Sequence, residues 1–302
     1  MEEYEHRVRV VPLPDGRRLR VRVWPGRGRP LVLVHGLLDD SVGWAPLARD
    51  TRRPAIAIDL PGFGGSDLPT RPRVSAYADD VAAAIGRMRL DGCTLVGHSL
   101  GGAVAAAVAE RSPLIGGLAL LAPVGFGSIR LAEAITLPGV VHVAQAALPF
   151  ALVSPLHVTA AYATLVAHRR LPSRDLMARL RRHAFRSAPG VRAATEAIAA
   201  AGRSSRGFHR RALEFDGPVA ALFGERDALV PLAHIAGVRR AVPHAHVEVW
   251  EAMGHHPQRE RPHELLAFLE AHALRGRPPG NQPTPAPDAV PARSARAAAE
   301  AA

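Results

Sequence analysis

Residues 94–102 read TLVGHSLGG, and they place one serine, Ser99, two positions after Gly97 and two positions before Gly101. The apolar run CTLV that leads into this stretch has the length and composition of a buried strand. The segment that follows, GAVAAAVAERS, is rich in alanine, as a helix would be. A strand, a sharp turn and a helix in this order predict that the turn strains the serine backbone and lifts its hydroxyl above a sheet.

Five further apolar runs have the same character as the strand before Ser99. They are PLVLVHG (30–36), PAIAIDLPG (54–62), LIGGLALLAP (114–123), PVAALFGERD (218–227) and HVEVWEAMGHH (246–256). Two alternating runs around residues 14–16 predict a β-hairpin at the start of the chain. Helical segments are predicted at 74–89, 100–111, 232–241 and 262–274. Alternating strands and helices indicate an α/β fold, with a mostly parallel, doubly wound sheet of about eight strands.

The order of the predicted strands and helices divides the chain into three parts. Residues 128–212 are helix-like, contain several prolines and offer no clear strand, so we expect an inserted helical cap. Residues 1–127 and 213–275 then form the core of the fold. Residues 276–302 are rich in Pro and Ala and have almost no large apolar side chain, so they predict a disordered tail.

Composition excludes some functions and leaves others open. The chain has 302 residues, 48% of them hydrophobic, which is enough for a sizeable core. Its formal net charge is +11, but all 38 basic residues are arginine in an alanine-rich chain, and a GC-rich genome accounts for that usage. Aromatic residues are only 5% and do not interleave with basic runs, so no nucleic-acid partner is predicted.

The remaining signals concern location. Cys93 is the single cysteine and cannot form an internal disulfide, which fits a reducing cytoplasm. The first residues lack the basic and apolar regions of a signal peptide, so we predict a cytoplasmic protein. No segment is predicted to span a membrane, because prolines and polar side chains interrupt the longest uncharged run.

The motif G-x-S-x-G in its strand–turn–helix context resembles the nucleophile elbow of the α/β-hydrolase superfamily, and the resemblance covers about residues 6–274. The family order of serine, acid and histidine implies a triad of Ser99, Asp227 and His255. Asp227 follows a late strand in FGERD. The place after the preceding strand, which some members use for the acid, has no acidic residue before Glu133. When GHHPQRERP is aligned with the family pattern G-H-x-x-x-x-E-x-P, the histidine of the pattern falls on His255. We therefore expect its neighbour His256 to be a surface loop residue.

Two more motifs fit the same resemblance. VLVHGLL resembles the oxyanion loop of the family, which implies that the backbone N–H groups of Leu37 and Leu100 bind a developing oxyanion. DLPGFGGSDLP resembles a turn common in the family, and we interpret its glycines as architectural. These glycines do not fit G-x-G-x-x-G, and a chain without lysine has no P-loop, so no cofactor is predicted. His244 and His246 lie close in sequence, but further ligands cannot be placed, so no metal is predicted either.

The resemblance implies a serine hydrolase that cleaves a carboxylic ester, or a related acyl bond, of a small apolar substrate through an acyl-enzyme. Dehalogenases and epoxide hydrolases of this fold carry Asp at the position of Ser99, which argues against both. Carbon–carbon hydrolases share the triad but usually carry added polar residues near the oxyanion loop, which HGLLDDSVGW does not show. A cofactor-free perhydrolase and an acyltransferase also share the triad and stay open, and a non-catalytic small-molecule receptor shares the fold. The expected partner is a small ester, and a membrane surface stays open as a second one.

The cap carries nearly all of the net charge. Residues 134–168 contain no Asp, Glu or Arg, whereas residues 168–211 contain 12 arginines and two acidic residues, a net charge of +10. One interpretation is an apolar helical layer over the site with its arginines in solvent. The other is that the apolar half lines an acyl pocket while the arginines attract anionic substrates or lipid surfaces.

Overall fold

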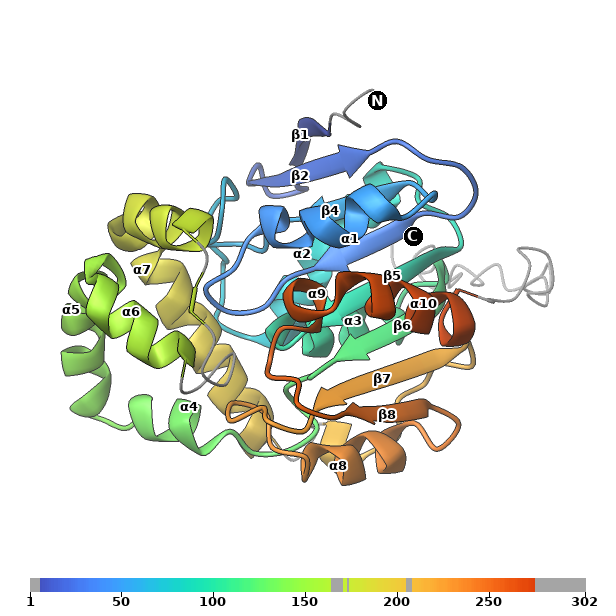
Figure 1. The fold of residues 1–302 in the computed structure, drawn as a ribbon. Helices are drawn as coiled ribbons and strands as arrows, with labels where there is room; N and C mark the ends of the chain where they lie inside the picture. The colour runs from blue at the N-terminus through green and yellow to red at the C-terminus, as the bar shows by residue number, and fades with distance from the viewer. Residues whose placement is uncertain (1–5, 164–170, 173, 205–207, 275–302) are drawn as a thin grey trace, which may run out of the picture.

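A single eight-stranded sheet organises the computed structural model, which describes residues 6–163, 171–172, 174–204 and 208–274 (Figure 1). The strand order is β1-β2-β4-β3-β5-β6-β7-β8. The strands are β1 (Arg7–Pro12), β2 (Arg18–Trp24), β3 (Leu31–Val34), β4 (Ala55–Ile58), β5 (Cys93–His98), β6 (Ile115–Leu121), β7 (Val219–Gly224) and β8 (His246–Trp250). The predicted tail at 276–302 lies outside the described residues.

The strand directions confirm the predicted mostly parallel sheet. β1 and β2 pair antiparallel as the hairpin around residues 14–16, and β2 pairs antiparallel with β4. From β4 through β8 every neighbouring pair is parallel. The carboxyl ends of the parallel strands therefore meet along one edge, which is where α/β folds place their ligands.

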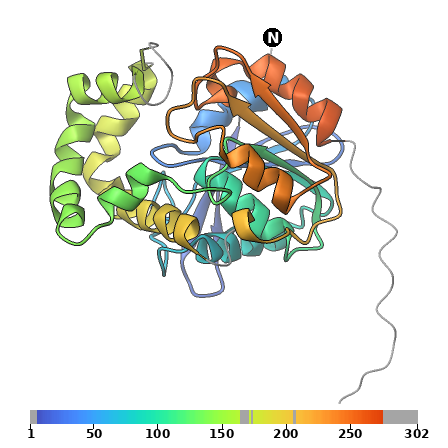
Figure 2. The ribbon, with the colours of Figure 1, turned by 90° about the horizontal axis from the view of Figure 1, so that it is seen from below.

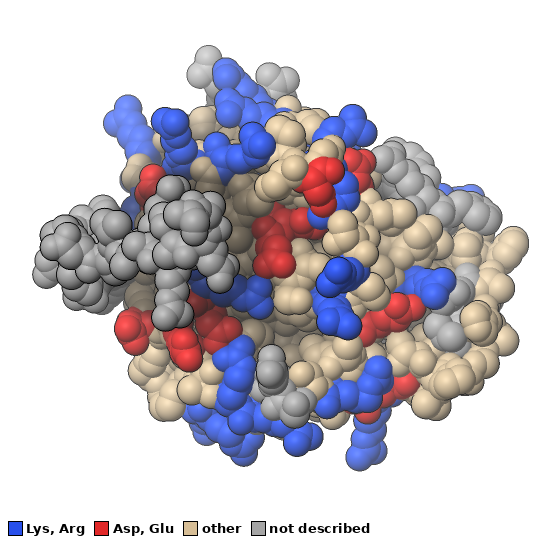
Figure 3. Space-filling model, turned by 180° about the vertical axis from the view of Figure 1, so that it is seen from behind, with Lys and Arg blue, Asp and Glu red and all other residues tan. Residues whose placement is uncertain are grey.

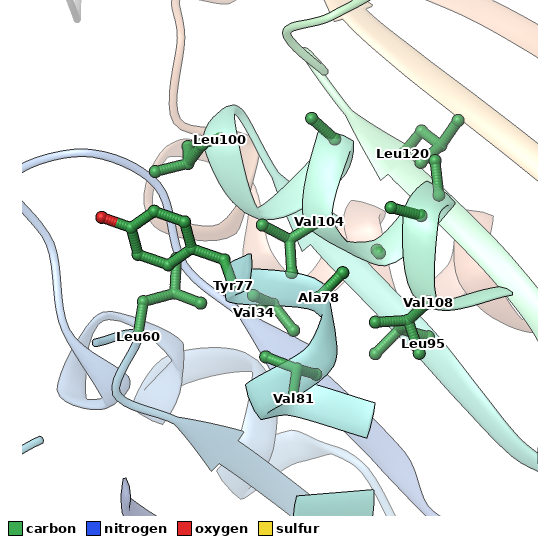
Figure 4. Packing of buried hydrophobic residues seen from close by; sticks show 14 of the residues in the cluster. Val34, Leu60, Tyr77, Ala78, Val81, Leu95, Leu100, Val104, Val108 and Leu120 are labelled. Carbon is green, nitrogen blue, oxygen red and sulfur yellow. The ribbon is translucent and has the colours of Figure 1, made fainter. Parts of the chain in front are cut away.

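Helices cover both faces of the sheet and produce two apolar clusters. One cluster contains side chains of α2 (Val74–Arg87) and α3 (Leu100–Ala109), which pack together on the sheet (Figure 4). It also contains side chains of α8 (His234–Ala241). The other contains side chains of α1 (Ala45–Asp50) and α10 (Pro262–His272), with Trp44 from the short helix η1 (Ser41–Trp44). Successive residues of β3 alternate between the two clusters, so this strand is apolar throughout. Cys93, at the start of β5, is fully buried in the first cluster.

The glycine-rich turn after β4 is architectural, as predicted. The buried Asp59 carboxylate accepts hydrogen bonds from the backbone N–H of Ser41 at 2.7 Å and of Gly65 at 2.9 Å. The Arg20 guanidinium pairs with the same carboxylate at 2.5 Å. Gly64 has φ +54°, and a Cβ there would overlap the Asp59 side chain, so only glycine fits. The turn thus joins β2, β4 and η1 through one carboxylate.

The described residues between 130 and 203, which we call the cap, are mostly helical and lie to one side of the sheet (Figures 1 and 2). They form α4 (Arg130–Ile135), α5 (Val140–Val153), α6 (Pro155–Ala161) and the 30-residue α7 (Arg174–Arg203), followed by the short η3 (Phe208–Arg210). α7 packs against α4 and α5 and also touches α2 of the core. Its Gly190 meets Gly62 in the turn after β4 so closely that neither has room for a side chain.

Among the helices of the described ranges, no one helix combines the length and the apolar character needed to cross a bilayer. The pair His142–Val153 and Pro155–Ala161 meets both criteria only when taken together, and it is bent by 103° at the break.

Candidate active site

The turn between β5 and α3 holds Ser99 in an uncommon backbone conformation. Its φ is 54° and its ψ is −115°, which a residue with a Cβ adopts only when the surrounding structure imposes it. A Cβ on Gly97 would collide with the Gly101 carbonyl, and a Cβ on Gly101 would collide with the Val34 carbonyl. The two glycines are therefore required because strand, turn and helix lie in direct backbone contact.

Asp227 and His255 form a buried hydrogen-bonded pair. Asp227 lies three residues after β7, and its Oδ2 is 2.7 Å from Nδ1 of His255. The two side chains are only 1% and 4% exposed. Oδ1 of Asp227 accepts the backbone N–H groups of Leu229 and Val230 at 2.8 and 2.9 Å. With Nδ1–H donating to the carboxylate, the lone pair of the His255 imidazole is on Nε2.

The surroundings of Asp227 favour its charged form. Burial alone would raise the pKa of this carboxyl, but the adjacent His255 ring and the N–H groups of Val230 and Leu229 outweigh it. The pKa of Asp227 therefore lies below its usual range, and the side chain is a carboxylate at neutral pH. A fixed carboxylate at Nδ1 holds the orientation of the imidazole and stabilises it when it is protonated.

His98 connects the serine turn to the His255 loop. Its Nε2–H donates to the His255 carbonyl at 2.7 Å, and the two rings lie 4.6 Å apart. Ser99 is the next residue, so the turn and the Asp227–His255 pair occupy the same end of the sheet. Among the described residues, the Ser99 hydroxyl has no hydrogen-bond partner. A hydrogen bond between a nucleophilic hydroxyl and its general base often tightens only when substrate is bound.

The two predicted oxyanion donors come from the start of α3 and from the loop that follows β3. Leu100 begins α3, so its N–H is one of the helix-terminal groups that has no partner within the helix. Leu37 follows Gly36, where a Cβ would come within 2.9 Å of the Ser99 Cβ. Within the described ranges, neither N–H donates to a protein acceptor. Both groups therefore remain available to an oxygen bound beside Ser99.

A buried ion pair that the sequence did not reveal joins the two loops. Arg259, in α9 (Pro257–Glu260), donates to Asp39, and their side chains are 14% and 2% exposed. Asp39 follows the loop that carries Leu37, whereas Arg259 follows His255. The partners are 220 positions apart in the sequence, which leaves no local signal for the pair. Glu260 adds bonds to the loop, because its carboxylate accepts the N–H groups of Gly254 and His256.

The prediction for His256 is wrong. It is not a surface loop residue but only 8% exposed, because its ring lies 4.7 Å from His98 and 6.3 Å from Tyr162 of the cap. Burial lowers the pKa of His98 to about 3 and the pKa of His256 well below its ordinary value. Both rings are therefore neutral at neutral pH, and Asp227 has no competing cation in this histidine cluster.

Two groups of side chains among the described residues have the composition and spacing to hold a metal ion. His98, His255 and His256 form a buried group, and His246, Glu248 and His272 form a partly exposed one. In each group the ligand atoms lie within 4.8 Å of one another. The second group supplies partners for His246 that the sequence did not allow us to place.

Comparison with known proteins agrees with this architecture. A family model described as the alpha/beta hydrolase family matches residues 31–268. An uncharacterized protein of Mycobacterium tuberculosis is 30% identical over 261 residues, which cover 81% of this chain and 75% of that protein. The dihydrolipoyllysine-residue acetyltransferase component of the acetoin cleaving system of Pseudomonas putida is 31% identical over 256 residues, which cover 81% of this chain and 64% of that protein.

Solved structures show the same fold at lower sequence identity. A putative lipase from Acinetobacter baumannii superposes with a TM-score of 0.72 at 19% identity, covering 88% of this chain and 90% of that one. A putative aryl esterase from Burkholderia cenocepacia gives a TM-score of 0.68 at 24% identity, covering 88% and 97%. With the family match over most of its length, the chain belongs to the alpha/beta hydrolase family.

Proposed function

We propose that the protein is a serine hydrolase that cleaves a carboxylic ester of a small, apolar substrate through an acyl-enzyme. Ser99 is the nucleophile, His255 is the general base and then the general acid, and Asp227 orients His255. The observation that carries the proposal is the buried 2.7 Å bond between Asp227 and His255, which leaves Nε2 unprotonated at the end of the sheet where Ser99 is strained.

The reaction has two steps. The Ser99 hydroxyl attacks the ester carbonyl while His255 Nε2 takes its proton, and the carbonyl oxygen becomes an oxyanion. The backbone N–H groups of Leu37 and Leu100 bind that oxyanion, an interaction worth about 3 kcal/mol per donor in related sites. The protonated His255 then donates to the leaving alcohol, and water attacks the acyl-enzyme by the same route in reverse.

The buried Asp39–Arg259 pair supports this assignment from outside the reacting groups. It ties the loop of Leu37 to the helix that follows His255, so the oxyanion donor and the base are held by one contact. Fixed donors contribute more to catalysis than mobile ones because they need no reorganisation as charge develops. A receptor has no comparable need to fix an N–H beside a serine hydroxyl.

Labelling and turnover test the proposal together. A fluorophosphonate probe should form one adduct at Ser99, and p-nitrophenyl esters of short and medium acids should be hydrolysed. Ser99→Ala should abolish both while keeping the melting temperature of the parent, and Ser112→Ala, outside the site, should change neither. Hydrolysis that persists at the parental rate in Ser99→Ala would exclude the proposed nucleophile. A folded protein with no adduct and no turnover of any ester would favour a receptor.

Acyl transfer is the second candidate, because a relative at 31% identity is named as an acetyltransferase component. The same acyl-enzyme would then be consumed by an alcohol or thiol rather than by water. Product analysis with competing acceptors separates the outcomes. Transfer products that exceed the free acid at millimolar acceptor would identify a transferase, and peracid formed from hydrogen peroxide would identify a perhydrolase.

A further inference from the structure

Three side chains near the start of β8 have possible metal-ligand atoms close to one another. His246 begins β8, Glu248 lies two residues later on the same face, and His272 ends α10. Oε1 of Glu248 is 2.7 Å from Nε2 of His246 and 3.5 Å from Nε2 of His272. The two imidazoles are stacked, with centroids 3.5 Å apart and planes within 7°.

The spacing suits a tetrahedral metal ion. Bonds of about 2.1 Å to imidazole nitrogen and carboxylate oxygen place neighbouring ligand atoms about 3.4 Å apart. The measured separations of 2.7 and 3.5 Å lie on both sides of that value, so small side-chain rotations would reach it. The rings would tilt out of their stack to direct both nitrogens at one ion. The side chains are 30–44% exposed and have room to do so.

The neighbours of the cluster fix its carboxylate. Trp250 Nε1–H donates to Oε2 of Glu248 at 2.9 Å, which leaves Oε1 toward the two histidines. Such an outer hydrogen bond orients a ligating carboxylate. Phe268 lies beside both rings, at 6.1 Å from His246 and 5.3 Å from His272, and limits their rotation on one side.

We propose that His246, Glu248 and His272 bind one Zn²⁺ ion, with water completing its coordination. Two imidazoles and one carboxylate suit Zn²⁺, whereas Mg²⁺ and Ca²⁺ prefer oxygen ligands throughout. The ion would join the first residue of β8 to the last residue of α10. Because the site requires the folded arrangement of both elements, bound Zn²⁺ stabilises the native protein.

The test uses the metal-free full-length protein, with Zn²⁺ and Mg²⁺ as probes. Calorimetry should show one Zn²⁺ per chain with micromolar affinity, and the melting temperature should rise with Zn²⁺ but not with Mg²⁺. His272→Gln and His246→Gln should each weaken Zn²⁺ binding at least tenfold. His244→Gln is the matched control, because its ring contacts the Gly217 carbonyl instead of the cluster.

Two results would overturn the zinc site. One is parental Zn²⁺ affinity in His272→Gln. The other is loss of binding in His256→Gln with retention in His246→Gln, which would place the ion at the buried histidine cluster. Circular dichroism of each variant identifies any that has failed to fold, and the two independent substitutions keep the test decisive.

A different observation concerns the outer face of the cap. Twelve large apolar side chains are exposed among the described residues, and seven of them lie between residues 131 and 171: Leu131, Leu137, Val140, Val143, Phe150, Leu156 and Leu171. Val143, Phe150 and Leu156 are 71%, 65% and 75% exposed. Concentration of such residues in one segment marks an interaction surface rather than scattered exposure.

α5 shows that this surface is organised. Val140, Val143 and Ala147 follow helical spacing and are all exposed, so they form one outward stripe. The opposite face of α5 packs on α7, and Leu152 there is buried. The packed side and the exposed side of α5 are therefore both apolar.

The charge of the cap distinguishes between the possible partners of the outward stripe. Residues 134–168 have no Asp, Glu, Lys or Arg, and residues 168–211 carry a net charge of +10 with His counted as neutral. α7, which packs on α5, exposes Arg174 and Arg181. A second copy docked by twofold symmetry would set two such charges against each other. The tail at 276–302 has a single large aliphatic residue, Val290, and cannot cover the stripe.

We propose that the outer face of α5 and α6 docks on an anionic lipid surface. The apolar stripe enters the headgroup boundary, and arginines of the cap attract the lipid charge. The 103° bend between the two helices suits a pair that lies in the interface. On the face opposite to that of Figure 1, arginines and acidic residues are interspersed, so that face offers no single-sign attraction (Figure 3).

Vesicle sedimentation tests the docking without any need for turnover. The full chain should bind vesicles with 30% phosphatidylglycerol at least tenfold more strongly than pure phosphatidylcholine, and salt should weaken the binding. The double variant Val143→Ser, Leu156→Ser should lose at least tenfold. The control Val8→Ser, Val10→Ser removes side chains of comparable exposure from β1 and should bind as the parent.

The alternatives give different results in the same experiment. Parental vesicle binding in the cap variant would overturn the proposal. So would a dimer by light scattering that the cap variant converts to monomer, because the stripe would then be a contact between copies. Ser99→Ala should bind vesicles normally, so docking and the proposed catalysis can fail separately.

Discussion

The sheet and the cap bury apolar side chains in different ways. In the sheet, β3 and β5 pack on both faces, and the register of parallel strands fixes where each following loop begins. In the cap, α5 packs on α7 but also carries strongly exposed apolar side chains, such as Val143. The proposed reacting groups therefore follow strands whose packing is fixed on both faces, where the position of each loop is well defined.

The largest expected effect lies at the edge of the sheet. Ser99→Ala, His255→Ala and Asp227→Asn should each lower kcat/KM for ester hydrolysis by about 10³-fold or more, because each removes a member of one catalytic unit. Melting temperatures should stay within a few degrees of the parent. Steady-state assays with a p-nitrophenyl ester measure the loss. Near-normal turnover in His255→Ala, together with loss in His256→Ala, would show that the other histidine is the base.

Next in size is a contrast between two ion pairs. Arg259→Gln should lower the free energy of unfolding by about 3 kcal/mol, because it leaves the buried Asp39 carboxylate without its cation. The matched cap substitution Arg192→Gln breaks an exposed pair with Glu196. It should change the free energy of unfolding by less than about 1 kcal/mol. Urea unfolding measures both. Equal effects would contradict the distinction between the two regions.

The third effect is a pH dependence of stability that belongs to the core. His98 and His256 have folded pKa values depressed by burial, so unfolding takes up protons below the unfolded value of about 6.5. Their stabilising contribution is complete above that pH and falls as the pH drops toward 3. Each histidine should give a slope of about 1.4 kcal/mol per pH unit. His256→Gln should lower the slope of unfolding free energy against pH by the contribution of one histidine. His142→Gln, on the exposed side of the cap, should leave the slope unchanged.

The smallest effect concerns substrate range and involves the cap. If its inner side lines an acyl pocket, kcat/KM should rise from acetyl toward medium-chain esters by up to about 0.8 kcal/mol per buried methylene. A series of p-nitrophenyl esters of increasing acyl length measures this. Flat or falling values would show that the cap does not extend the acyl site.

The sequence predicts the sheet better than the contacts between loops. Apolar runs without alternation identified β3 to β7, and the G-x-S-x-G context located the strained serine because strand, turn and helix are adjacent in the chain. Side chains that meet across the fold gave no such signal. Arg259 reaches Asp39 across 220 residues, and His272 reaches His246 only because α10 returns to β8. The burial of His256 likewise depends on His98 and on Tyr162 of the cap.

Cys93 gives this protein an intrinsic reporter of unfolding. It is the single thiol of the chain, it is fully buried at the start of the strand that leads to Ser99, and burial raises its pKa to about 12. A protonated, enclosed thiol does not react with alkylating reagents until the strand separates from its neighbours. The rate of alkylation in native buffer therefore measures how often the centre of the sheet opens. Any variant can be compared on that scale without an added label.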